Sequence, residues 1–285
     1  KTKCLFLVVV MHCVMFFATP FPFWKLYADS PQPLADLVTA ISGTTLIQSF
    51  MMASGFLFAA AWDSGKRPPL QHLLHRGRRL LLPWFGVGML WVAPLYWLFS
   101  IPAFGHPADT SLVDTWKSVA LGLFTDHLWF LLVLFWVTAF WIVALSVLKK
   151  CGHDTAVVGG MVALVAALCV QNYGQWIKWY CLWEIPAYIL CYYLGIVVYR
   201  NRDALDALCR KHPLALGLGL LAMIILLWPY AFAPVSGWVV SLLCALLMYH
   251  MFLLTAGLYP LLQSISVFTW FERNGFRFYL FLLPT

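Results

Sequence analysis

Residues 1–17 read KTKCLFLVVVMHCVMFF, an apolar run that begins behind Lys1 and Lys3 and contains one histidine, His12. A run of this kind predicts a transmembrane helix, which needs about 20 residues at a rise of 1.5 Å each. Lys1 and His12 are separated by about three helical turns and therefore share one face. His12 then lies roughly 16 Å deeper than Lys1, near the bilayer midplane. An ionisable side chain at that depth is costly, so His12 is a candidate functional residue; the alternative is a histidine that hydrogen-bonds a neighbouring helix.

The composition excludes an ordinary soluble domain. The 285 residues are 63% hydrophobic and 10% charged, whereas average chains carry about 25% charged residues. The abundant Trp, Tyr and Phe fit aromatic belts at two membrane interfaces. The net charge of +7 does not indicate nucleic-acid binding, because the basic residues lie in short loops. The eight cysteines show neither a C-x-x-C pair nor zinc-ligand spacing, so we expect no metal site and no disulfide framework.

Apolar stretches separated by prolines, glycines and charges predict an all-α, polytopic membrane helix bundle with eight full transmembrane helices. They cover residues 4–19, 34–62, 80–100, 127–148, 155–170, 181–199, 213–228 and 235–256. The segments 63–79, 101–126 and 200–212 are expected to be loops. The last residues, YLFLLPT at 279–285, look like the start of another span. We therefore expect one integral-membrane domain, 1–285, whose last span is cut short.

Lysine and arginine divide unevenly between the two sides that this span count defines. One side holds 15 of the 18, and the other holds only Lys25, Lys117 and Lys178. By the positive-inside rule the richer side is cytoplasmic, so the N-terminus is expected in the cytoplasm.

A basic cluster, HRGRRLLLP at 75–83, stands at the predicted cytoplasmic mouth of the third span. It contains Arg76, Arg78 and Arg79. One interpretation is ordinary inside-positive anchoring. The other is an anion site, because arginine forks match the phosphate oxygens of a nucleotide-bearing donor such as coenzyme A.

The outer end of the fourth span carries Asp126 and His127 directly before Trp129. The Asp-His pair suits a proton relay, or a helix N-terminus with Asp126 as its cap. Trp129 suits an interface anchor.

Polar residues also interrupt other spans. Ser54-Gly55 in the second span follows Gln48, and a small pair in a membrane helix is most often a close-packing site. Glu184 and His250 lie at or near membrane depth, and each either lines a cavity or is paired for packing.

Taken together, these residues resemble membrane acyltransferase family 3, bacterial enzymes that O-acylate surface and periplasmic sugars. The resemblance covers nearly the whole chain. Because the family usually has about ten spans, it implies that the domain 1–285 lacks its last one or two helices. Two positions depart from the family pattern: Lys1 stands where arginine is usual, and Leu282 where histidine is common. The matching motifs, in chain order, are Lys1 followed after ten residues by His12, SGFL at 54–57, R-x-x-R and proline at Arg76, Arg79 and Pro83, HLWFL at 127–131, and the tail residues Tyr279, Leu280 and Pro284.

The resemblance implies transfer of an acyl group, acetyl in the first instance, from cytoplasmic acyl-CoA to a hydroxyl of an extracytoplasmic or lipid-linked sugar. Acyl-CoA is then a co-substrate and no cofactor is bound. Arg76 and Arg79, with Lys1 at the same end, would hold the donor phosphates. A neutral His12 would act as general base or as acyl carrier. The acceptor side would include His127, Trp129, Ser54 and Gly55, and the protein would lie in the bacterial cytoplasmic (inner) membrane.

Two other functions use the same features. A transporter or exporter subunit for a glycan or small anion would use the intramembrane histidine and arginines as gating or pathway groups. The sequence shows no inverted repeat, which many transporters have. A non-catalytic scaffold is the third hypothesis, and it gives no reason for a buried His12 to coexist with an arginine-rich mouth.

Overall fold

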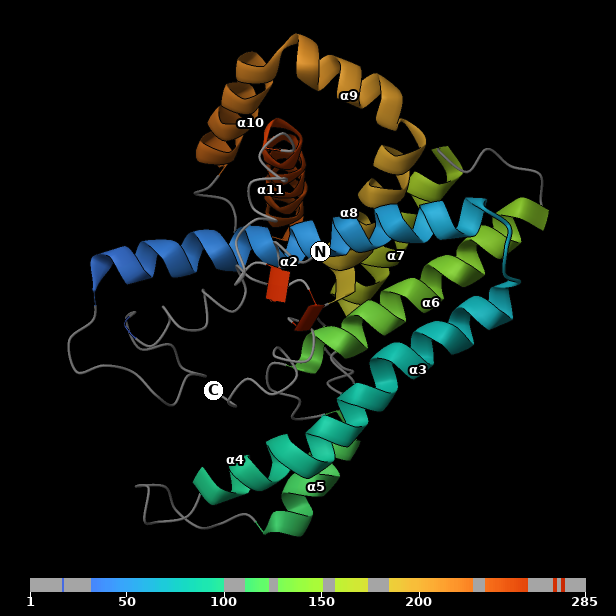
Figure 1. Ribbon diagram of the computed structural model, residues 1–285, viewed down its shortest axis with the longest axis vertical. Helices are drawn as coiled ribbons and strands as arrows, with labels where there is room; N and C mark the ends of the chain where they lie inside the picture. The colour runs from blue at the N-terminus through green and yellow to red at the C-terminus, as the bar shows by residue number, and fades with distance from the viewer. Residues whose placement is uncertain are drawn as a thin grey trace. The chain divides into compact units, whose positions relative to one another are not determined.

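The computed structural model describes Phe17 and residues 32–99, 111–122, 128–150, 157–173, 185–227, 234–255, 269–270 and 273–274. Within these ranges the chain is helical, without a strand, as the sequence predicts (Figure 1). The helices are α2 (Pro33–Asp63), α3 (Pro69–Val87), the π-helix η1 (Gly88–Val92), α4 (Ala93–Phe99), α5 (Leu112–Ala120), α6 (Trp129–Lys150), α7 (Val157–Tyr173), α8 (Ile185–Arg200), α9 (Arg202–Lys211), α10 (Pro213–Leu227) and α11 (Pro234–Leu254).

Helices of membrane-spanning length and composition are present in this part of the chain. Among the described residues, Leu46–Asp63, Pro69–Leu98 and Trp129–Lys149 are long and apolar enough to cross a membrane. A fourth span results if α9 and α10, bent by 99° at His212, are counted as one. The prediction of a helical membrane protein is confirmed in this form. The described residues contain three or four candidate spans, and the count of eight stays a prediction. The predicted first span and the tail stretch lie outside the described residues.

Proline sets where many of the helices begin. Pro33, Pro69, Pro213 and Pro234 are each the first residue of a helix. Proline lacks a backbone N–H and has a fixed φ, both of which suit the first helical turn. The loop prediction for residues 63–79 was therefore wrong from Pro69 onward, because this proline begins helix α3.

Two further segments that were predicted as connections are helical. α9 places Asp203 in its first turn and Arg210 and Lys211 in its last, so its charges complement the helix dipole. α5 is amphipathic, with Thr115 and Val119 buried on one side. In both segments the charges favour a helix outside the apolar spans. A search for apolar runs does not detect such a helix.

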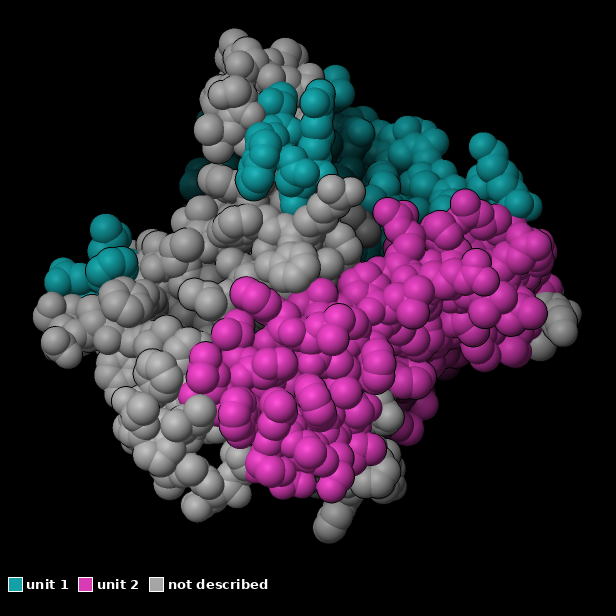
Figure 2. All heavy atoms as spheres, turned by 60° about the horizontal axis from the view of Figure 1, so that its bottom comes forward, with its two compact units in different colours: residues 1–66, 187–276 teal, residues 67–186, 277–285 magenta. Residues whose placement is uncertain are grey.

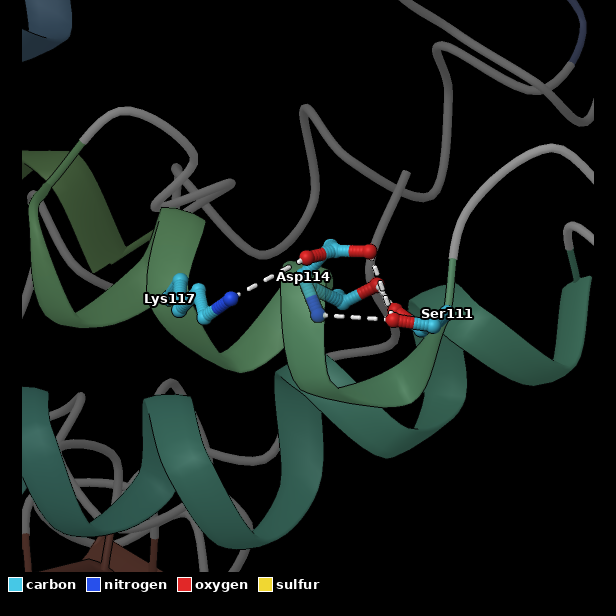
Figure 3. Close-up of polar contacts among 4 residues, drawn as sticks. Ser111, Asp114 and Lys117 are labelled. Atoms are coloured by element: carbon cyan, nitrogen blue, oxygen red, sulfur yellow. Dashed lines mark hydrogen bonds and ion pairs between the residues drawn. The ribbon is translucent and has the colours of Figure 1, made fainter.

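The N-terminus of α5 is capped by its own side chains (Figure 3). The Ser111 Oγ accepts a hydrogen bond from the Asp114 backbone N–H at 3.1 Å and donates one to Asp114 Oδ2 at 2.6 Å. Lys117 Nζ lies 3.5 Å from the other carboxylate oxygen. This arrangement satisfies one of the backbone N–H groups that a helix leaves unpaired at its start.

The chain divides into two compact units, coloured separately in Figure 2. Unit 1 contains residues 1–66 and 187–276, and unit 2 contains residues 67–186 and 277–285. In unit 1, α11 packs against α2, α9 and α10. In unit 2, α3 runs along α6 (Figure 1), and α5 packs on α4 and η1. Each unit buries large side chains, Met51, Phe58, Tyr192 and Ile196 in unit 1 and Leu131, Leu132, Trp141 and Leu145 in unit 2.

The third predicted span is helical through Pro83 and widens into a π-turn at η1. Trp116 on α5 donates its indole N–H to the Met89 carbonyl in this turn at 2.9 Å. A π-turn commonly marks a local strain or a functional position in a helix. Here the hydrogen bond from Trp116 gives the Met89 carbonyl of the π-turn a partner and fixes α5 to η1.

Candidate functional site

The predicted site residues fall into three groups in the structure. Lys1, His12 and His127 lie outside the described residues, as do Glu184 and the tail motif. Ser54 and Gly55 belong to α2 in unit 1. Arg76, Arg79 and Trp129 belong to unit 2.

The basic cluster lies inside helix α3. At about 100° per residue, Arg76 and Arg79 are separated by roughly 60° and share a face with His72 and His75. Arg78 lies roughly 160° from Arg76, on a different side of the helix. The R-x-x-R spacing thus places two of the three guanidinium groups together and separates the third.

The arginine charges are not neutralised within the described part of the chain. Arg76 is half-buried, whereas Arg78 and Arg79 are exposed. None of the three pairs with a described carboxylate, and the sequence has no acidic residue from 64 to 107. Unpaired guanidinium groups that share a face are suited to bind phosphate or carboxylate oxygens.

The packing of α3 on α6 holds this basic face in place. Leu80 and Trp84 are buried, and a Cβ added to Gly77 would meet the Phe135 ring at 3.6 Å, an ordinary contact distance. Trp129, the first residue of α6, is half-buried, and its ring meets that of Phe130 edge to face at 6.1 Å.

Gly55 lies where α2 and α8 cross with their backbones in contact. A Cβ on Gly55 would collide with the Tyr192 carbonyl, and a Cβ on Gly195 would collide with the Met52 carbonyl. The side chains of Phe58 and Tyr192 pack beside this crossing at a ring separation of 5.7 Å. The close-packing interpretation of the Ser54-Gly55 pair therefore agrees with the geometry of Gly55, while its role beside the acceptor stays a prediction.

Several buried polar atoms of unit 1 have no hydrogen-bond partner among the described residues. Ser54 is fully buried and its Oγ is unpaired, and Gln48 Oε1 is in the same situation. His250 is buried on α11 and uses only one of its two ring nitrogens. Thr39 Oγ1 on α2 is also buried and unpaired. Buried polar groups are nearly always paired, so these four atoms need an explanation.

Sequence reasoning missed the ion pair between Asp63, at the end of α2, and Arg200, at the end of α8. It also missed Gly195 as the partner of the Gly55 crossing. A signal for the ion pair was present, because opposite charges end two spans that were predicted to finish on the same side. A single glycine in an apolar helix gives no comparable signal.

Apolar helices of spanning length, with charged clusters at their ends, define a polytopic membrane protein. The sequence model of one family, described as an acyltransferase domain, matches residues 1–284. The chain therefore belongs to acyltransferase family 3, and its class of activity is acyl transfer. A comparison with curated proteins found no match, and neither did a comparison with solved structures.

Proposed function

We propose that this acyltransferase moves an acyl group, acetyl in the first instance, from cytoplasmic acyl-CoA to a hydroxyl of an extracytoplasmic or lipid-linked sugar. One observation carries the donor assignment: the shared, acid-free face of Arg76 and Arg79 on α3, in a chain that matches the acyltransferase family along its length. A face of this kind suits a polyanionic donor, and coenzyme A carries phosphates at the end remote from its thioester.

The donor phosphates would lie at the arginine face, and the thioester arm would extend into the helix bundle. Arg76 and Arg79 can each present a fork to phosphate oxygens. Lys1, predicted at the same membrane side, would add one point charge without a fork. The carbohydrate acceptor would approach from the other side, where His127 and Trp129 are expected to shape its entrance. Ser54 and Gly55 would line the pocket that it reaches.

His12 would supply the chemistry at membrane depth. As a general base, its imidazole takes the proton of the acceptor hydroxyl while that oxygen bonds to the acyl carbon. The carbon–sulfur bond of the thioester breaks, and the thiolate that leaves takes up the proton from the imidazolium. As a covalent carrier, the imidazole nitrogen itself forms the bond to the acyl carbon and then passes the group to the hydroxyl.

The membrane arrangement follows the distribution of basic residues. We propose a multi-pass protein of the bacterial cytoplasmic membrane with its N-terminus in the cytoplasm. The shorter apolar helices Val158–Cys169, Tyr188–Arg200 and Trp238–Met251 would complete the eight spans together with the predicted first one.

The test is acetyl-CoA turnover by the purified protein in detergent, with wild type beside His12→Ala. We expect His12→Ala to lose CoA release while its yield of folded protein stays unchanged. His106→Ala, in a predicted polar connection, is the matched histidine control and should retain turnover. Equal turnover in wild type and His12→Ala would show that His12 has no catalytic role. A wild type that neither binds acetyl-CoA nor releases CoA would overturn the proposed acyl transfer from acyl-CoA.

A further inference from the structure

Arg67 lies directly before helix α3, in unit 2. Pro68 is extended, and the helix begins at Pro69. The Pro68 carbonyl accepts a hydrogen bond from the His72 backbone N–H at 3.1 Å, so this segment continues without a break into the first turn. Arg67 is exposed, and no described carboxylate pairs with it. It is therefore a further cation beside the basic face of α3.

The Arg67 side chain lies close to that face. The positive charges of Arg67, Arg79 and Arg76 all act on the half-buried His75 ring, and Arg67 has the largest effect of the three. Arg67 and Arg76 also act on His72, one turn earlier on α3. Because such effects weaken with distance, the Arg67 guanidinium must lie near both rings. It therefore belongs to the same cluster of charges as Arg76 and Arg79.

This cluster contains only cations within the described part of the chain. The sequence has no acidic residue from 64 to 107, so nothing nearby along the chain offsets Arg67, Arg76 and Arg79. Like charges that gather in this way repel one another, and a bound polyanion would remove that cost. Each guanidinium can present a fork to phosphate oxygens. The cluster is thus suited to a ligand with more than one phosphate group.

The three arginines follow one another along the axis of α3. At a rise of 1.5 Å per residue, Arg76 and Arg79 stand roughly 10 and 15 Å beyond Pro69. Arg67 precedes Pro69 and so lies before the candidate span Pro69–Leu98 begins. Arg67 is therefore the outer member of the cluster, and Arg76 and Arg79 are the inner pair.

Coenzyme A carries its phosphates in a matching order. The thioester arm is joined to a diphosphate, the diphosphate to a ribose, and a separate phosphate stands on the ribose 3′-hydroxyl. In the proposed donor pose the thioester arm extends from Arg76 and Arg79 into the helix bundle. The diphosphate is then the inner anion and the ribose phosphate the outer one, which falls at Arg67.

We propose that Arg67 binds the 3′-phosphate of coenzyme A, while Arg76 and Arg79 bind its diphosphate. Arg67 is then the residue that selects coenzyme A over donors that lack a ribose phosphate. This inference rests on the proposed function, because it concerns the donor of that reaction. It adds to it by naming a residue outside the R-x-x-R motif and the phosphate that this residue recognises.

The test compares the binding of coenzyme A and 3′-dephospho-coenzyme A to the detergent-solubilised full chain by isothermal titration calorimetry. Wild type should bind coenzyme A about 10- to 100-fold more tightly, the range for one charge-assisted hydrogen bond. Arg67→Gln should bind both ligands equally, with the affinity that wild type has for the dephosphorylated one. Arg67 is exposed and precedes the helix, so this variant should retain the Tm of wild type.

Matched variants separate this contact from a general effect of charge. Arg76→Gln and Arg79→Gln should weaken the binding of both ligands by the same factor and so retain the preference for coenzyme A. Arg78→Gln removes the same charge from another side of α3 and should change neither affinity. Arg67→Lys, which keeps the charge but not the fork, should retain only part of the preference.

Each outcome bears on the role of Arg67. Equal binding of the two ligands by wild type, or an unchanged preference in Arg67→Gln, overturns it. A uniform loss of affinity for both ligands in Arg67→Gln also overturns it, because that is the effect of unspecific attraction. Loss of the preference in Arg76→Gln or Arg79→Gln instead would assign the ribose phosphate to the inner pair and likewise overturn the role.

CoA release from acetyl-CoA, measured on the same samples, tests the proposed function separately. A wild type that prefers coenzyme A through Arg67 but releases no CoA would overturn acyl transfer from acyl-CoA and leave the phosphate site in place. A wild type that releases CoA but binds the two ligands equally would retain acyl transfer and overturn only the role of Arg67.

Discussion

The guanidinium of Arg200 forms a fork around the carboxylate of Asp63. Nη2 lies 3.1 Å from Oδ1, and Nε lies 3.2 Å from Oδ2. The pair joins the last residues of α8 and α2, so these two helices finish at the same end of unit 1. Phe56 and Tyr199 pack edge to face on the same two helices at 5.2 Å. The predicted topology places these two helix ends on one side of the membrane, and the ion pair agrees with that placement.

Breaking this fork should destabilise unit 1 only slightly. The two side chains are 28% and 35% exposed, so water screens the pair, and the expected coupling is about 0.5 to 1 kcal/mol. The measurement is a double-mutant cycle of Asp63→Asn and Arg200→Gln by unfolding in detergent. Arg200→Lys, which retains the charge but loses the fork, should recover only part of the coupling. A coupling energy of zero would show that the fork contributes nothing to stability.

The α2–α8 crossing should tolerate no side chain at either glycine. Gly55→Ala and Gly195→Ala each place a methyl group against a carbonyl of the other helix, and backbone cannot rotate away as a side chain can. Overpacking of this kind costs about 1 to 3 kcal/mol or more in unfolding free energy. Gly219→Ala is the control, because its Cβ meets nothing within 4 Å. Equal Tm values for Gly55→Ala and Gly219→Ala would show that the two helices are not in backbone contact.

The start of α5 should loosen at low pH. The hydrogen bond from the Ser111 hydroxyl, and secondly Lys117, hold the pKa of Asp114 below its usual value of 3.8. A lowered carboxyl pKa means that the ionised form stabilises the folded segment; this contribution is complete above about pH 4 and is lost as the pH falls through the lowered pKa. Carbon-13 titration of the aspartate carboxyls measures the effect directly.

The same titration identifies the cause of the shift. Ser111→Ala should return the Asp114 pKa toward its usual value by more than Lys117→Met does, because the Ser111 bond is the larger contribution. A greater change in Lys117→Met would show that charge, rather than the cap hydrogen bond, sets the pKa.

The long apolar helices could be predicted from the sequence because each depends on a local property, a run of apolar residues of spanning length. α2 and α6 begin and end within a few residues of the predicted spans. The helices α5 and α9 were not predicted, since their stability comes from caps and charges at their ends rather than from hydropathy. The π-turn at η1 depends on tertiary contacts such as the Trp116 bond, and no sequence signal marks it.

The candidate site likewise has features that the sequence predicts and features that depend on tertiary contacts. The shared face of Arg76 and Arg79 follows from helical spacing alone, so the motif spacing was sufficient to predict it. The role of Gly55 at a backbone crossing depends on where α8 passes, which the sequence does not indicate. His250 was noticed as an ionisable residue in a span, but its hydrogen bond to the Pro213 carbonyl joins residues that are 37 positions apart in the chain, which the sequence does not indicate.

The two interpretations of the arginine cluster lead to different mutant kinetics. If the cluster only anchors the protein through positive charge, Arg76, Arg78 and Arg79 contribute alike, and Arg78→Gln should affect the protein as much as the other two. If Arg76 and Arg79 bind the donor phosphates, as we propose, only the face that they share matters. Arg76→Gln and Arg79→Gln should then each raise the KM for acetyl-CoA about 10- to 100-fold, the range for a charge-assisted hydrogen bond.

Arg78→Gln, which removes the same charge from the other side of α3, is the matched control and should leave this KM within about twofold of wild type. The measurement is CoA release against acetyl-CoA concentration, at low and at high salt, because an exposed phosphate site weakens as ions screen it. The salt dependence should be smaller in Arg76→Gln and Arg79→Gln than in wild type and Arg78→Gln. Three variants with the same KM would favour anchoring and would require the donor phosphates to bind elsewhere in the protein.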